Sequence, residues 1–190
     1  MALMKYWLWL SGKARISAQK KAALLNHFGT VENLYYAENK SYLETEGITP
    51  EDIRLLSDKS FDRAERIMED CEKSGIKVVT IQDAEYPDRL KNIFAPPVVL
   101  YYRGTFPVFD EEAAIAIVGT RSGTAYGRIV TERLGYDISR AGGYVVSGMA
   151  RGLDACAHMG ALKAGKPTAA VLGSGPDIVY PAENRELYED

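Results

Sequence analysis

The sequence is poor in cysteine and has no long apolar segment. Its two cysteines, Cys71 and Cys156, are far apart and lack metal-ligand spacing, which is typical of buried thiols in a reducing cytoplasm. No apolar run approaches the roughly 20 residues that cross a bilayer. The opening MALMKYWLWLSGK lacks a basic leader and a small-residue cleavage site. We therefore predict a cytoplasmic chain without membrane association, whose first apolar residues form a helix of a folded domain.

The chain also lacks an overall positive charge, but its charge is unevenly distributed. The net charge of the 190 residues is -3, which excludes a uniformly cationic nucleic-acid binder. Residues 121–166 nevertheless hold seven basic and three acidic side chains, a local charge of +4. Local basicity near glycine-rich turns is what a polyanion site requires. The simplest interpretation of Arg128, Arg133 and Arg140 is that they are solvated residues on a helix face.

Residues 1–75 predict a small all-helical domain. Ser17 is placed to cap a helix that ends at Gly29, and Thr49 precedes a proline at the first helical position. The HFGT ending of the second helix is typical of helix-hairpin-helix or sterile-alpha-motif-like (SAM-like) modules, although simple helix packing explains the same residues. A role of this segment as a protein-interaction module also remains open.

Residues 76–190 predict an α/β domain with a Rossmann-like, mostly parallel sheet. Continuous apolar strands at 113–119, 144–148 and 167–173 alternate with helices at about 125–140 and 153–164. Strands of that character are typical of a parallel sheet buried on both faces. The last strand is followed by a polar helix with no returning strand, from which we expect a fragment of a longer protein, incomplete at its C-terminal end.

Each of the three apolar strands ends in a glycine-rich turn. In a parallel sheet these turns share the carboxyl edge, where doubly wound folds bind ligands. Positions 119, 121 and 124 read Gly, Arg and Thr, so the dinucleotide fingerprint is absent, as is a P-loop. Arg121 instead offers a permanently charged fork for an external phosphate. The turns predict a phosphate site for a nucleic-acid backbone without a cofactor.

Catalytic and metal-binding patterns are sparse. Asp154 and His158 share a helix face, but no third ligand accompanies them, so we interpret them as structural residues. We predict no catalytic residue, no metal and no enzymatic activity. The alternative is a phosphoribohydrolase-like, nucleotide-processing enzyme on a related fold, although no second acid accompanies Asp154 near the turns.

Four ordered motifs between about Tyr86 and Asn184 resemble the DNA-processing protein family DprA, also called Smf. They are YPDRL…PPVVLYYRG, AIVGTRSGTAYG, VVSGMARGLDACAHMGAL and GKPTAAVLGSGPDIVYPAEN. The resemblance implies a Rossmann-like protein that binds and protects single-stranded DNA and loads the recombinase RecA during natural transformation. It also implies a homodimer and no established catalytic reaction. A downstream Phe-Pro-x-Arg-Asn-Arg-type stretch and a winged-helix-like tail of the family are absent from this sequence.

The resemblance also assigns site residues. Arg121 in the first turn and Lys166 become phosphate contacts, and the second turn, 147–152, becomes part of the same site. With the third turn added, the predicted DNA phosphate-binding residues are Gly119, Thr120, Arg121, Ser147, Gly148, Met149, Ala150, Arg151, Lys166, Gly173 and Ser174.

Overall fold

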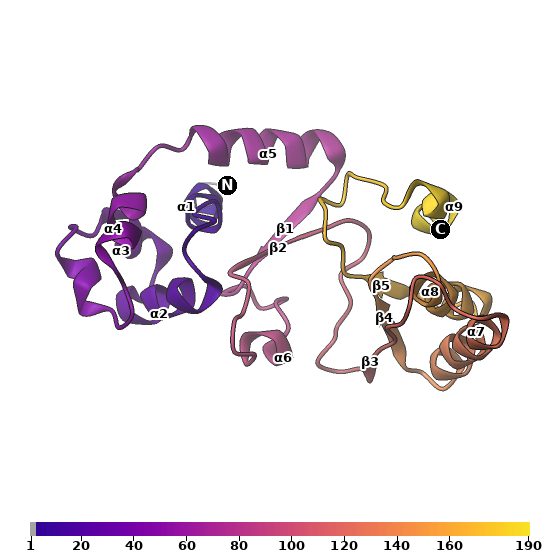
Figure 1. The fold of residues 1–190 in the computed structure, drawn as a ribbon. Coiled ribbons are helices and arrows are strands. Elements are labelled where there is room, and N and C mark those ends of the chain that lie inside the picture. Colours follow the sequence, from indigo (N-terminus) through magenta and orange to yellow (C-terminus); the bar gives the residue numbers. More distant parts are fainter. Residues whose placement is uncertain (1–2) are drawn as a thin grey trace. The chain divides into compact units, whose positions relative to one another are not determined.

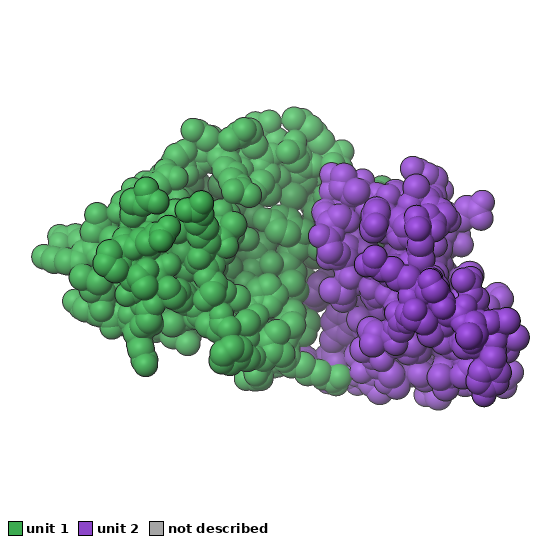
Figure 2. All heavy atoms as spheres, in the orientation of Figure 1, with its two compact units in different colours: residues 1–104 green, residues 105–190 purple. Residues whose placement is uncertain are grey.

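The computed structural model describes residues 3–190 and divides into two compact units, unit 1 (residues 1–104) and unit 2 (residues 105–190) (Figures 1 and 2). The elements of unit 1 are α1 (Met4–Ser11), α2 (Ala18–Phe28), α3 (Val31–Tyr36), η1 (Ser41–Glu44), α4 (Pro50–Ser57), α5 (Asp62–Ser74), β1 (Lys77–Thr80), α6 (Asp88–Lys91) and β2 (Val99–Tyr102). Within the described residues, no helix is long and apolar enough to cross a membrane.

Two helices of unit 1, α2 and α4, begin where local sequence signals predict. The Ser17 side chain accepts a hydrogen bond from the amide of Lys20 and caps α2. Thr49 and Asp52 form a reciprocal capping box at the start of α4, directly before Pro50. These helices enclose an apolar core to which α1 contributes five consecutive buried residues, Tyr6 to Leu10.

Unit 1 extends beyond the predicted boundary at residues 75–76. β1 pairs with β2 in an antiparallel two-stranded sheet. α1 contacts β2 and α5 contacts β1, and Val99 of β2 is buried in the helical core. The first compact unit is therefore not all-helical, because this hairpin has its apolar partner in the preceding helices.

Unit 2 contains a parallel three-stranded sheet in the order β3-β4-β5. Its elements are β3 (Ala114–Ala116), α7 (Ala125–Arg140), β4 (Tyr144–Ser147), α8 (Leu153–Lys163), β5 (Thr168–Ala170), η2 (Ala182–Asn184) and α9 (Arg185–Glu189). α7 and α8 pack side by side (Figure 1). Gly135 lies against the carbonyl of Ala157, and Gly160 against the carbonyl of Glu132, so neither glycine has room for a Cβ. These two contacts let the helix backbones approach closely.

The expected burial of the sheet on both faces is wrong for its outer strands. Val145 of the central strand β4 is fully buried, whereas Ile115 of β3 is 40% exposed and Val171, just after β5, is 68% exposed. The physical reason is that a parallel sheet is buried on both faces only when helices cover both. In the described part of unit 2, the most extensive contacts between helices and strands are those of α7 and α8, which also pack on each other.

Candidate functional site

The first two glycine turns meet at the carboxyl edge of the sheet. The amide of Leu153, at the start of α8, donates to the carbonyl of Thr120 at 3.2 Å. Gly152 has a φ of +81°, and a Cβ there would lie 2.5 Å from the carbonyl oxygen of Thr120. Only glycine fits this conformation and this approach, so Gly152 holds the second turn against the first.

The amino end of α8 is already occupied by a carboxylate of the chain itself. Asp154 is 7% exposed, and its Oδ1 accepts the amide of Gly119 at 3.2 Å. Its Oδ2 lies 2.8 Å from where a Cβ on Gly148 would stand. The negative charge at this helix terminus is thus supplied internally. The sequence predicts that Gly119 binds phosphate, but its amide already donates a hydrogen bond to Asp154.

Among the residues that the structure describes, no such internal anion lies at the amino end of α7. Its first turn holds no acidic residue, and Thr124 caps it by accepting the amide of Gly127 at 3.0 Å. Arg121 is exposed, and within the described residues its guanidinium has no ion-pair partner. The backbone amides of Thr120 and Arg121 likewise take part in no hydrogen bond of the described chain. Helix dipole, open amides and one guanidinium together form an anion-binding arrangement.

The second turn is held mainly by internal contacts. The Ser147 hydroxyl is buried and donates to the carbonyl of Ile117 at 2.6 Å. Met149 is buried with a φ of 58°, and its carbonyl accepts the side-chain amide of Asn184 at 2.9 Å. Arg151 forms an ion pair with Glu183, in which Nη2 lies 2.8 Å from Oε2. Ser147 and Met149 therefore shape the turn, and Arg151 is free for a ligand only if it leaves Glu183.

The third turn reaches the same edge, but Lys166 does not. The amide of Val171 donates to the carbonyl of Ser147, which places exposed Gly173 and Ser174 beyond the end of β5 and beside the second turn. Lys166 precedes β5 and therefore lies at the amino edge of the same parallel sheet. The fold brings the three turns together and separates Lys166 from them.

His158 is a buried structural residue of α8. Its Nδ1 lies 2.8 Å from the hydroxyl oxygen of Thr168, and that hydroxyl donates to the carbonyl of Val145. Because the hydroxyl gives its own proton to Val145, Nδ1 is the donor to the hydroxyl oxygen, and Nε2 is an acceptor that has no hydrogen-bond partner in the described chain. Burial lowers the pKa of His158 to about 4, against the raising effect of Asp154. The side chain is neutral at pH 7 and joins α8 to β5.

Two residues that hold the second turn, Asn184 and Glu183, were not identified as functional from the sequence. They lie 32 to 35 positions from the turn residues they contact. The available signal in the sequence was their place in the polar segment PAEN. No group of three or more potential metal ligands occurs in the described chain.

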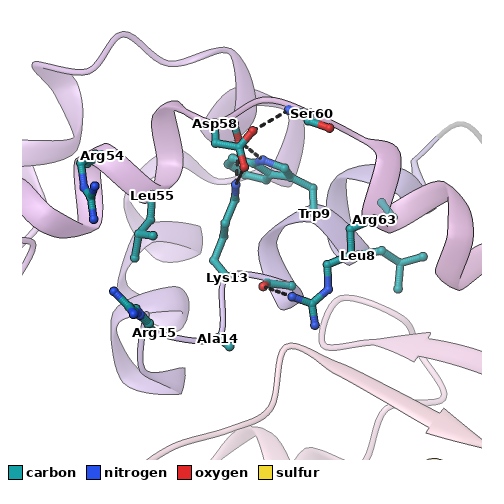
Figure 3. Close-up of a pocket in the computed structure, with 12 residues that line it drawn as sticks. Leu8, Trp9, Lys13, Ala14, Arg15, Arg54, Leu55, Asp58, Ser60 and Arg63 are labelled. Atoms are coloured by element: carbon teal, nitrogen blue, oxygen red, sulfur yellow. Dashed lines mark hydrogen bonds and ion pairs between the residues drawn. The ribbon is translucent and has the colours of Figure 1, made fainter.

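Unit 1 has its own basic hollow, of about 440 Å³, between the end of α1, α4 and the start of α5 (Figure 3). Lys13 donates to the backbone carbonyl of Asp58 at 2.6 Å and lies 3.2 Å from its carboxylate, and Arg63 donates to the carbonyl of Gly12. These cations neutralise Asp58 and the carbonyl end of α1, as helix C-termini favour. The hollow is held together by internal contacts, which leaves the turns of unit 2 as the stronger candidate site.

Comparison with known proteins places this architecture among DNA-processing proteins. The family model described as DNA recombination-mediator protein A matches residues 77–190. Protein Smf of Synechocystis is 32% identical over 188 residues, which cover 97% of this chain and 47% of that protein. The chain spans about half the length of the curated relatives it matches.

Two solved structures share the fold. The X-ray structure of DNA processing protein A (DprA) from Streptococcus pneumoniae superimposes with a TM-score of 0.79 at 26% identity, covering 100% of this chain and 64% of that one. DNA processing protein A from Helicobacter pylori, described for its single-stranded DNA binding mode, gives a TM-score of 0.50 at 29% identity over 61% of this chain and 52% of that one.

Proposed function

This chain belongs to the DNA recombination-mediator protein A family, and from that premise we propose that it binds single-stranded DNA through the turn between β3 and α7. In this proposal Arg121 contacts a backbone phosphate, and the open amides of Thr120 and Arg121 complete the contact. Binding through phosphates reads no base sequence, so the interaction is general for single strands.

The observation that carries the proposal is the contrast between two helix ends. The amino end of α8 is satisfied by Asp154, whereas the amino end of α7 has no acidic residue in its first turn and is preceded by Arg121, which has no ion-pair partner in the described chain. An external anion is the group that such a helix end accommodates. The Helicobacter pylori relative, described as a single-stranded DNA binder, supports nucleic acid as the source of that anion.

Titration of the complete protein with a fluorescent oligothymidylate tests this role. Arg121→Ala removes one phosphate contact, so we expect weaker binding and a slope of log affinity against log salt that falls by about 0.7, the value for one phosphate on a single strand. Lys166→Ala is the matched control, because it removes an exposed cation from the opposite edge of the sheet. Unchanged affinity and unchanged slope in Arg121→Ala would contradict the proposal.

The wider role that we propose is that of a cytoplasmic, non-enzymatic recombination mediator. It protects incoming single strands and loads RecA onto them in natural transformation, and it acts as a homodimer in the complete protein. Family membership supports this role, as do the DNA-processing proteins among its relatives. RecA assembly on single-stranded DNA, followed with and without the protein, tests the loading step. If the protein does not accelerate RecA assembly, the proposed loading of RecA is wrong.

A further inference from the structure

The outer face of α7 carries a row of aromatic, aliphatic and basic side chains, all of them exposed except Tyr136, which is half-buried. Tyr126 is 77% exposed and Ile129 is 69% exposed. Arg133, Tyr136 and Arg140 continue the row at alternating spacings of three and four residues. At 3.6 residues per turn these positions fall within about 80° of arc and extend along about 21 Å of helix. The row faces away from the buried positions of α7, which are Thr131, Gly135 and Ser139.

A groove of about 370 Å³ runs beside this row. Its lining residues are Arg128, Ile129, Glu132, Arg133, Tyr136 and Lys163. Three of these side chains are basic and one is acidic; with Asp137 beside Arg133 also counted, the groove keeps one uncompensated positive charge, that of Arg128.

Two of the basic side chains are held in place by carboxylates. Arg133 pairs with Asp137 at 2.7 Å, and Lys163 pairs with Glu132 at 2.5 Å. The Arg133 guanidinium also lies 5.7 Å from the centre of the Tyr136 ring. These exposed pairs hold the cations along the groove and cost little to open.

The row and the groove continue directly from the phosphate turn. Tyr126 is the second residue of α7, five positions after Arg121. Arg128 bridges the two features, because its Nε donates to the carbonyl of Gly123 at 3.2 Å. A strand whose phosphate sits at the turn therefore meets an exposed aromatic ring first and a line of cations next.

We propose that the outer face of α7 is a second contact surface for the same single strand, with a base stacked on Tyr126 and phosphates held by Arg128, Arg133 and Lys163. This inference rests on the function proposed above and adds the path of the strand beyond the turn. Interleaved aromatic rings and cations are the combination that binds single-stranded nucleic acid without sequence preference. A duplex offers phosphates to the cations but no unstacked base to Tyr126.

Oligothymidylates of two lengths, about 4 and about 16 nucleotides, separate the turn from this surface in the complete protein. Tyr126→Ala should weaken binding of the longer strand by about 5-fold to 150-fold, the loss of one stacked base, with a much smaller effect on the short strand. Tyr126→Phe should bind as the unaltered protein does. Leu134→Ala, which removes a side chain that is 49% exposed elsewhere on α7, is the matched control.

The charge of the groove gives an independent measurement. Asp137→Asn releases Arg133 from its ion pair, so binding of the longer strand should tighten and its salt dependence should steepen. Arg133→Gln should have the opposite effect on both quantities.

The outcomes distinguish this inference from the proposed function. The proposed function and the α7 surface are both supported if Arg121→Ala weakens binding of both oligothymidylates and Tyr126→Ala weakens binding of the longer one alone. An effect of Arg121→Ala without any effect of Tyr126→Ala or Asp137→Asn overturns the α7 surface alone. No effect of either Arg121→Ala or Tyr126→Ala overturns both. If Tyr126→Ala impairs association with another protein and leaves DNA affinity unchanged, the surface is a protein-docking site and the inference is wrong.

Discussion

Acid should destabilise unit 2 through His158. Its imidazole is buried and neutral, and burial lowers its pKa from 6.5 to about 4. Between these two pH values the unfolded chain binds a proton that the folded chain does not. The contribution of His158 to the free energy of unfolding is therefore complete above about pH 6.5 and is lost as the pH drops toward 4. The difference of about 2.5 pKa units corresponds to about 3 kcal/mol in full, and to about 2 kcal/mol on going from pH 7 to about pH 5.

Denaturant unfolding at about pH 7 and about pH 5 measures this change in the free energy of unfolding. His158→Asn can keep a donor toward Thr168 and removes the titrating ring, so this variant should lose about 2 kcal/mol less on acidification. Proton NMR of the two histidines gives a direct check. A His158 resonance that titrates near its ordinary pKa in the folded protein, or equal acid dependence in His158→Asn, would refute the reasoning.

Three further predictions concern stability. Gly160→Ala forces a Cβ against the carbonyl of Glu132, so α7 and α8 must separate, and thermal unfolding should show a loss of about 2 kcal/mol; an unchanged melting temperature would mean that the helices shift freely. Thr49→Ala removes the capping-box hydroxyl of α4 and should cost about 1 kcal/mol in urea unfolding, whereas Thr49→Ser should cost less. Burial lowers the pKa of Lys59 to about 8, so the folded chain loses this proton before the unfolded chain does. Stability of unit 1 should therefore rise between about pH 8 and pH 10, and Lys59→Met should flatten that rise in a chemical denaturation series.

Local sequence signals predict most helix boundaries because their causes are local. The predicted helix at about 125–140 matches α7, and Ser17 and Thr49 cap the helices they precede. Capping depends on atoms within four residues, so a single sequence contains the information. The β1–β2 hairpin lies in the segment that the sequence analysis assigned to the α/β domain, whereas the structure places it in unit 1. That placement depends on apolar contacts with α1 and α5, which lie far away in the sequence.

Sequence alone determined that three glycine turns end three parallel strands and that Arg121 is a fixed positive charge in the first of them. The resemblance counted Lys166 among the phosphate contacts, but this residue precedes β5 and therefore lies at the opposite edge of the parallel sheet. Only the tertiary structure decided which helix end is open to an anion. A hydrogen bond across 35 residues commits Asp154 to Gly119, and contacts of similar range hold the second turn with Asn184 and Glu183. Residue types set the charges that are available, whereas the fold decides which of them neutralise one another and which are left for a ligand.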